Sequence, residues 1–186
     1  MKLKRCNWGN SNADDLYREY HDHEWGKLNL NEQYLFEMLV LESFQSGLSW
    51  ATILHKRENF RKAFANFEIA KVAQFDDQDF ERLMHDEGIV RNKLKIKAAI
   101  NNAKMILKME EAGSSFAAFL QAYLPQPIIN HPKQMSDIPS QTELSKKISN
   151  GLKKKGFKFV GPVTVYSFLQ AVGLINDHLD DCSFKY

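Results

Sequence analysis

The stretch Glu32–Gly47, EQYLFEMLVLESFQSG, decides the fold of this chain. Leu35, Met38 and Leu39 precede Glu42 at helical spacing, so the stretch predicts one helix with Glu42 in an apolar stripe. A second apolar stripe is formed by Phe36, Val40 and Phe44. A helix that is apolar on most sides is buried on most sides. We therefore expect this helix to lie at the centre of the molecule.

Glu42 is out of place in such a helix, because a lone buried charge is costly unless something pairs with it. Gln45, Gly47, Ser49 and Trp50 follow closely. A buried carboxylate beside an aromatic ring suits recognition of something polar, flat or cationic. The alternative is a structural glutamate bound to a backbone amide or an arginine, and this stretch alone leaves both interpretations open.

Composition sets the limits. The 186 residues suffice for one domain, or one domain with a sub-lobe, and 25 Lys and Arg against 23 Asp and Glu give a net charge of +2. That balance neither proves nor excludes a nucleic-acid partner. No run of eighteen apolar residues predicts a membrane span, and the N-terminal MKLKRCNWGN lacks the apolar segment of a secretory signal. We expect a cytoplasmic protein that makes no membrane contact.

Helix signals dominate the rest of the chain, and no stretch is a convincing strand, so the predicted fold class is all-α. Residues 125–141 hold four of the five prolines and predict an irregular surface connection. The further predicted helices are Trp50–Phe64 capped by Ser49, a short one from Asp76 or Asp77 that Gly88 ends, one from Asn92 to about Glu111 that Gly113 stops, Ser115–Tyr123, one opened by a Ser140–Glu143 capping box and ended by Gly156, and one from Pro162 to Gly173.

Cysteine and histidine occur together near both ends of the chain. His178 and Cys182 share a helix face if their segment is helical, and Cys6 is followed by His21, with His23 two residues later. One Cys and one His from each end would complete a closed tetrahedral zinc site that pins the ends together. The spacing is not that of a zinc finger, and two ordinary thiols with two surface histidines remain an alternative.

The stretch Lys153–Pro162, KKKGFKFVGP, predicts a tight turn between two helices. Gly156 and Gly161 would let the backbone approach a ligand, and amides at the start of a helix favour an anion such as a DNA phosphate. Lys158 and the lysine run would add long-range attraction. The alternative is a common helix–helix turn with a solvated basic cap. A second basic cluster, expected to be mostly a solvated helix face, consists of Arg91, Lys93, Lys95 and Lys97.

Four aromatic residues are expected near Glu42: Tyr17, Tyr20, Trp25 and Trp50. Rings with one carboxylate suit a flat cationic base, because stacking and cation–π attraction favour a positively charged ring. Each ring taken singly is also what a hydrophobic core would contain.

Taken together, these motifs resemble the 3-methyladenine-DNA glycosylase I family, of the helix-hairpin-helix glycosylase superfamily. The matching stretches run in order over about residues 5–182: Tyr20–Gly26, Leu41–Trp50, Lys56–Arg61, Gly156–Pro162, and Asn176–His178 with Cys182. Ser46 and Phe44 depart from the expected pattern, at positions where we expect alanine and a polar residue.

The resemblance implies a single glycosylase domain over 1–186, with two helical lobes around the base pocket as an option. It implies excision of 3-methyladenine from alkylated double-stranded DNA by a monomer, with the free base as product. One structural Zn²⁺ per chain would be held by Cys6, His21, His178 and Cys182, leaving His23 an ordinary neighbour. Glu42 would recognise the base with Tyr20 and Trp50 as ring contacts. Tyr17, Trp25 and Gln45 would complete the pocket, and Lys158, Gly161 and Gly156 would contact DNA.

Three alternatives remain at this point. The same scaffold could excise a different alkylated purine. A helical protein could bind DNA or RNA through the hairpin and lysines without releasing a base, although such a protein has no need of Glu42 and its rings. The zinc and aromatic residues could also serve stability alone.

Overall fold

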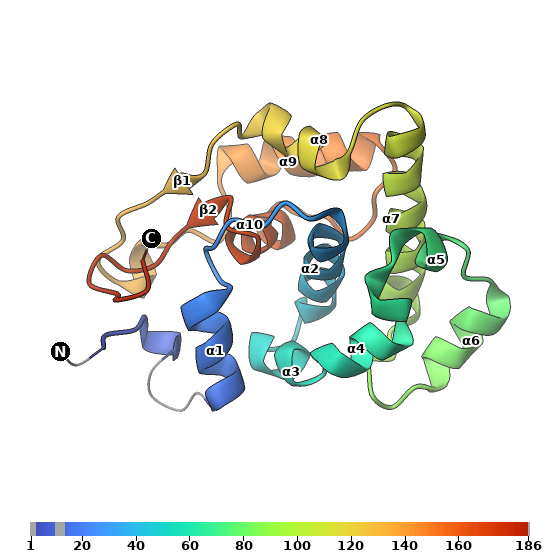
Figure 1. The fold of residues 1–186 in the computed structure, drawn as a ribbon, viewed down its shortest axis with the longest axis horizontal. Helices are drawn as coiled ribbons and strands as arrows, with labels where there is room; N and C mark the ends of the chain where they lie inside the picture. Colours follow the sequence, from blue (N-terminus) through green and yellow to red (C-terminus); the bar gives the residue numbers. More distant parts are fainter. Residues whose placement is uncertain (1–2, 10–13, 186) are drawn as a thin grey trace.

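Helix α2 (Glu32–Gln45) lies at the centre of the molecule, as its apolar stripes predict (Figure 1). The structure is a computed structural model that describes residues 3–9 and 14–185. The ends of the predicted 1–186 domain, and parts of the stretch MKLKRCNWGN, therefore lie outside the described residues. All ten residues from Leu35 to Phe44 are buried, including Glu37 and Glu42. Asn31 caps the helix by accepting from the amide of Tyr34.

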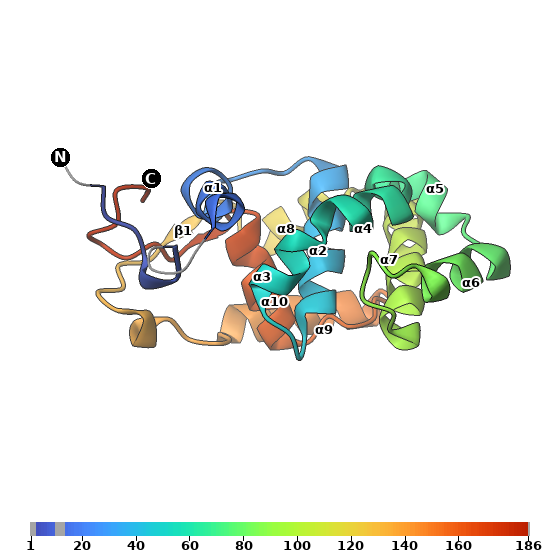
Figure 2. The same ribbon diagram turned by 90° about the horizontal axis from the view of Figure 1, so that it is seen from below.

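Helices surround α2 on nearly all sides, and the predicted all-helical class is correct in its main feature. α10 (Pro162–Ala171) packs against α2 and α9 (Glu143–Lys154), and the long α7 (Lys93–Glu111) packs against α5 (Ile69–Ala73) (Figures 1 and 2). The other helical elements of the described residues are η1 (Asn7–Gly9), α1 (Asp15–His23), α3 (Trp50–His55), α4 (Arg57–Ala63), η2 (Ala65–Phe67), α6 (Asp77–His85), α8 (Phe116–Tyr123) and η3 (Met135–Asp137).

Three helix boundaries differ from the prediction. The predicted helix Trp50–Phe64 is two helices, because the chain tightens at Lys56, whose amide donates back to the carbonyls of Ile53 and Leu54. Thr142, not Ser140, caps α9, in a capping box with Ser145. Gly88 does not end α6, since that helix stops at His85 with Asp86 as its C-cap.

Two short strands were not predicted. β1 (Ile128–Ile129) pairs in parallel with β2 (Ile175–Asn176), and two residues are too few to show an alternating pattern. The pair ties the proline-rich connection to the segment after α10. No described helix has both the length and the apolar character that crossing a bilayer requires.

The first and last described segments lie side by side at one end of the molecule (Figures 1 and 2). The amide of Lys4 donates to Ser183 Oγ at 3.0 Å, and the amide of Ser183 donates to the carbonyl of Lys4 at 2.9 Å. This closure brings residues from both ends next to α1, where the candidate site lies.

Candidate active site

A cavity of about 130 Å³ opens between η1, α1, α2, α3 and α10. It is lined by Trp8, Tyr17, Tyr20, Trp25, Glu42, Gln45, Trp50, Ser167 and Gln170. All six residues that the sequence assigned to a base pocket thus line one cavity. A water molecule occupies about 30 Å³, so the space suits a single flat ring system and not a whole nucleotide.

Glu42 lies in the wall of this cavity with 6% of its surface exposed. Among the described residues, Glu42 Oε2 and Trp50 Nε1 are the two buried side-chain polar atoms without a hydrogen-bond partner. Burial raises the pKa of Glu42 from 4.5 to about 8. An unpaired buried polar atom costs about 1–3 kcal/mol, a cost that a bound ligand can remove. The interpretation of Glu42 as a carboxylate paired with an arginine or an amide is therefore wrong for Oε2.

Aromatic rings form most of the remaining wall. The rings of Tyr20 and Trp50 have centroids 5.1 Å apart with planes tilted by 44°. Trp8 meets Tyr17 and Trp25 edge-on, at 5.3 and 5.0 Å. Burial, and then the charge of Glu42, raise the pKa of Tyr20 well above 10, so its phenol keeps its proton. The cavity thus combines ring faces, the hydroxyls of Tyr17, Tyr20 and Ser167, and one partnerless carboxyl group.

Sequence reasoning missed three residues of the cavity: Trp8, Ser167 and Gln170. Gln170 carries a usable signal, because it is a polar residue on a helix whose neighbours Leu169 and Ala171 are fully buried. Ser167 lies one turn before it. Trp8 sits in a single 3₁₀ turn, where no helical or strand period applies.

A groove of about 300 Å³ adjoins the cavity and shares Glu42, Gln45 and Ser167 with it. Its other lining residues are Ser46, Gly47, Leu48, Val163 and Thr164. Leu48 and Val163 are exposed at 43% and 50% on its rim. The groove joins the cavity to the start of α10, where the α9–α10 hairpin ends.

Lys95 holds the α2 end of this groove and is the exception in the second basic cluster, whose Arg91, Lys93 and Lys97 are exposed as expected. Its Nζ donates to the carbonyls of Phe44 and Ser46 at 2.9 and 2.6 Å. Lys95 is buried, and burial lowers its pKa. The bond to Ser46 fixes the turn that carries Gly47 and Leu48.

The four predicted metal ligands come together in one buried cluster. The ligand atoms of Cys6, His21, His178 and Cys182 all lie within 4.8 Å of one another. His178 Nδ1 is 3.5 Å from Cys6 Sγ and 3.4 Å from Cys182 Sγ, and His21 Nε2 is 3.8 Å from Cys182 Sγ. Ligands at zinc bond lengths in a tetrahedron are about 3.4–3.8 Å apart. The cluster therefore could hold a metal ion.

The surroundings of the cluster orient its two histidines. His21 Nδ1 is 2.7 Å from Asp22 Oδ1, and Asp22 also accepts three hydrogen bonds from Arg5 at 2.7–3.0 Å. His178 Nε2 lies 2.9 Å from the carbonyl of Trp25. Such outer partners fix the ring orientation of metal-binding histidines. Hydrogen bonds from Cys6, then from His178 and His21, hold the pKa of the Cys182 thiol below its usual range.

The segment from His178 to Cys182 is not helical, so a shared helix face does not explain why these two residues meet. A turn brings them together instead, with the amide of Cys182 donating to the carbonyl of Leu179 at 2.9 Å. His23, which the resemblance left outside the site, is exposed and faces Glu19.

The α9–α10 hairpin is fastened from within. Asn102 holds both the amide and the carbonyl of Lys158, at 2.8 and 2.9 Å, and Ser149 Oγ donates to the carbonyl of Val160 at 2.6 Å. Gly156 has φ +92°, and a Cβ there would lie 2.8 Å from Met105 Sδ, so the fold itself needs this glycine. At Gly161 an added Cβ would meet nothing within 4 Å. Lys158 and Phe159 are exposed at the tip.

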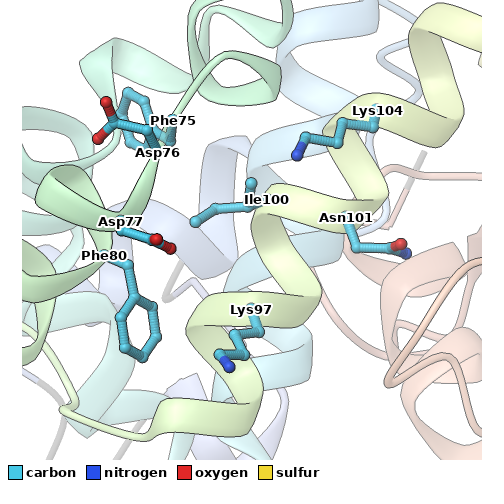
Figure 3. A pocket seen from close by; sticks show the side chains of 8 residues that line it. All are labelled: Phe75, Asp76, Asp77, Phe80, Lys97, Ile100, Asn101 and Lys104. Atoms are coloured by element: carbon cyan, nitrogen blue, oxygen red, sulfur yellow. The ribbon is translucent and has the colours of Figure 1, made fainter.

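Another cavity, of about 400 Å³, lies away from these sites between α7 and the segment around α6 (Figure 3). Lys97, Asn101 and Lys104 line it from α7, and the Asn101 amide points to the other side, where it donates to the carbonyl of Gly156 at 2.9 Å. Lys97 Nζ lies 5.3 Å from the centre of the Phe80 ring, and Asp76 caps α6. None of the predicted site residues lines this cavity, and two of its charged groups, Lys97 and Asp76, make the local contacts just described.

Comparison with known proteins agrees with this geometry. The family model described as methyladenine glycosylase matches residues 8–186. The DNA-3-methyladenine glycosylase 1 of Escherichia coli K12 is 46% identical over 181 residues, 97% of this chain and 96% of that protein. The DNA-3-methyladenine glycosylase of Haemophilus influenzae is 42% identical over 182 residues, 97% of each chain.

Solved structures show the same fold. A crystal structure of a 3-methyladenine DNA glycosylase I superposes with a TM-score of 0.93 at 45% identity, covering 97% of this chain and 98% of that one. The Staphylococcus aureus 3-methyladenine DNA glycosylase I, studied for its recognition of 3-methyladenine, gives a TM-score of 0.93 at 43% identity over 99% of this chain and 97% of that one.

Proposed function

The chain belongs to the methyladenine glycosylase family and is a glycosylase enzyme, and from this premise we propose that it hydrolyses the bond between 3-methyladenine and deoxyribose in alkylated DNA. One observation carries the substrate assignment: the partnerless buried carboxyl group of Glu42 faces an aromatic cavity with room for one ring system. Because a base in a duplex cannot enter such a cavity, the enzyme must take it out of the stack.

Glu42 would distinguish the alkylated base by its charge. With a pKa of about 8, the side chain is mainly protonated at pH 7 in the empty cavity. A cationic base favours the ionised form, so its binding releases the proton and forms a charge-assisted hydrogen bond to the exocyclic amino group. Neutral adenine gains neither this bond nor the attraction between a cation and the rings of Tyr20 and Trp50.

The substrate supplies most of the activation for its own leaving group. When the C1′–N9 bond breaks, its electron pair moves to the positively charged base, which leaves as neutral 3-methyladenine. A water oxygen bonds to C1′, and the proton of that water passes to solvent. The cavity contributes binding, orientation and exclusion of water from the base. Tyr17, Trp25 and Gln45 would complete the contacts to the base.

We propose that Cys6, His21, His178 and Cys182 hold one structural Zn²⁺ per chain. Two thiol and two imidazole ligands at tetrahedral spacing suit zinc, and all four positions are filled by protein, which supplies a cross-link and leaves no place for a substrate. Elemental analysis should find about one zinc per chain. If the metal is absent and Cys182→Ala keeps its thermal stability, the proposal is wrong.

The α9–α10 hairpin would act as a helix-hairpin-helix element that binds the DNA backbone, with Lys158, Gly161 and Gly156 in the contact. The open space at Gly161 and the exposed Lys158 support close approach of a phosphate. Leu48 would fill the gap left by the displaced base, and its exposure beside the groove supports this role. We further propose that residues 1–186 form a single domain whose helical lobes flank the base pocket. The protein would be a monomer and would act in the cytoplasm.

Release of free base from methylated DNA tests the function. Purified protein should liberate 3-methyladenine, detected chromatographically, and leave abasic sites. Salt-dependent binding of DNA without any released base would contradict the proposal and favour a binding protein. A panel of other alkylated purines would show whether a different base is preferred.

A further inference from the structure

Gln170 lines the base cavity from α10, and a second buried carboxylate determines which way its amide group points. Its Nε2 donates to Asp177 Oδ2 at 2.7 Å. Asp177 is 1% exposed and also accepts from Tyr166 Oη at 2.6 Å and from Asn130 Nδ2 at 2.7 Å. A carboxylate has no hydrogen to donate, so the amide nitrogen of Gln170, and not its oxygen, must face it.

The carbonyl oxygen of Gln170 is consequently the atom left for the cavity. Within the described residues, Gln170 Oε1 has no hydrogen-bond partner. In the part of the chain that the structure describes, the fully buried side-chain polar atoms without a hydrogen-bond partner are Glu42 Oε2 and Trp50 Nε1, and Gln170 Oε1 is not among them. An oxygen that has no partner and is absent from that set has some solvent-accessible surface. The oxygen is therefore accessible from the cavity that its side chain lines, and the cavity offers an acceptor there.

We propose that Gln170 is a specificity-determining residue that accepts a hydrogen bond from the base, and that Asp177 is the positioning residue that holds it in this orientation. The proposal rests on the proposed function and deepens it. A 6-aminopurine can donate to Gln170 Oε1. A 6-oxopurine would place one acceptor against another, and such a mismatch is strongly rejected by a buried site. The site thus selects 3-methylated bases that carry an amino group.

Binding of two free bases tests the proposal. We would titrate the protein with 3-methyladenine and with 3-methylhypoxanthine, following the fluorescence of the cavity tryptophans. The measured quantity is the Kd of 3-methylhypoxanthine divided by the Kd of 3-methyladenine. In Gln170→Met, which keeps the length of the side chain but removes the acceptor, this ratio should fall about tenfold, because one hydrogen bond to 3-methyladenine is lost and an acceptor clash with 3-methylhypoxanthine is relieved.

Asp177→Asn tests the positioning role separately. If Asn130 keeps its bond to the remaining oxygen, the new amide nitrogen faces Gln170, which then turns its oxygen away from the cavity. The Kd ratio should fall at least as far as in Gln170→Met, because the amide nitrogen now faces the cavity, and the double variant should show the ratio of Gln170→Met. Tyr166→Phe is the matched control, because it removes one donor to Asp177 but leaves Gln170 facing an acceptor, so it should retain the wild-type ratio.

Metal content and unfolding should be measured for each variant, because Asp177 precedes His178 in the cluster. An unchanged Kd ratio in folded Gln170→Met overturns the proposal, even if Asp177→Asn does not fold. A fall in the ratio for Tyr166→Phe equal to that for Asp177→Asn overturns the positioning role. Wild-type protein that binds neither base overturns the proposed function along with this inference.

Discussion

Helix α2 carries two buried glutamates that differ in one respect. Glu37 and Glu42 are each 6% exposed, but Glu37 Oε1 is held by Arg57 at 2.7 Å and by Arg61 at 2.8 Å, whereas Glu42 Oε2 has no partner. Arg57 also binds Glu24, at 2.8 and 2.9 Å. The comparison teaches that burial alone does not mark a functional carboxylate. The missing partner does, because it leaves an interaction for the ligand to complete.

The largest expected effect is at the paired end of the helix. Arg57→Met leaves Glu24 and Glu37 without their shared partner, and we expect the free energy of unfolding to fall by about 3 kcal/mol, as is typical of breaking a buried ion pair. Urea denaturation measures this. Arg18→Met, at an exposed pair with Asp15, should change it by less than about 0.5 kcal/mol. A loss below 1 kcal/mol for Arg57→Met would contradict the structural role assigned to Glu37 and its arginine partner.

The next largest effect is on the rate of base release and concerns Glu42, the glutamate without a partner. Glu42→Gln removes the charge-assisted bond to the base, so the single-turnover rate of 3-methyladenine release should fall roughly 10- to 100-fold, the equivalent of about 1.5–3 kcal/mol. Glu37→Gln is the matched control, with the same substitution on the same helix, and should keep the rate within about twofold while lowering stability. Unchanged release by Glu42→Gln would refute the role of this residue.

The pH dependence of stability separates the two glutamates further. Because folding raises the pKa of Glu42 from 4.5 to about 8, the folded state binds its proton more tightly than the unfolded state does. The stabilisation is complete below pH 4.5 and is lost as the pH rises toward 8, with a slope of up to about 1.4 kcal/mol per pH unit. Urea denaturation from pH 5 to 8 should show this slope in wild-type protein. Glu42→Gln should reduce it, and an equal slope in both proteins would contradict the assignment.

The smallest effect is at Arg61, the second partner of Glu37. The Arg61 side chain is one-third exposed, and Arg57 still neutralises Glu37 when Arg61 is removed. Arg61→Met should therefore lower the free energy of unfolding by about 1 kcal/mol or less. Urea denaturation of Arg61→Met and Arg57→Met, measured in parallel, compares the two losses in the free energy of unfolding. A loss as large as that of Arg57→Met would show that the two arginines are not graded by burial.

The sequence predicts the helices well where one strong local signal acts alone. Asn92 was expected to open α7 and is its N-cap, and Gly113, expected to stop it, has φ +80°. Where two capping residues compete, as Ser140 and Thr142 do before α9, the local pattern does not decide. The pairing of β1 with β2 depends on contacts between distant segments, which periodicity does not report.

The candidate site was predictable in its residue types more than in its assembly. Glu42 and Trp50 stand out because each belongs to a motif beside an apolar helix. Cys6 and His178 meet only through the closure of the chain ends, and their spacing in the sequence carries little information about it. Trp8 joins the cavity because Cys6, two residues earlier, is held in the cluster. The orientation of the Gln170 amide follows from its contact with Asp177, which the sequence alone does not reveal.

The joined ends of the chain also have a mechanical consequence. Because the segment at Lys4 is bonded to Ser183 and Cys6 lies beside Cys182, a pulling force applied at Lys4 and Ser183 is borne first by the cluster and its neighbours. The helical core would feel no tension until that closure opens. The same closure brings the first and last described segments together, so a covalent link between these two segments would keep the arrangement of helices.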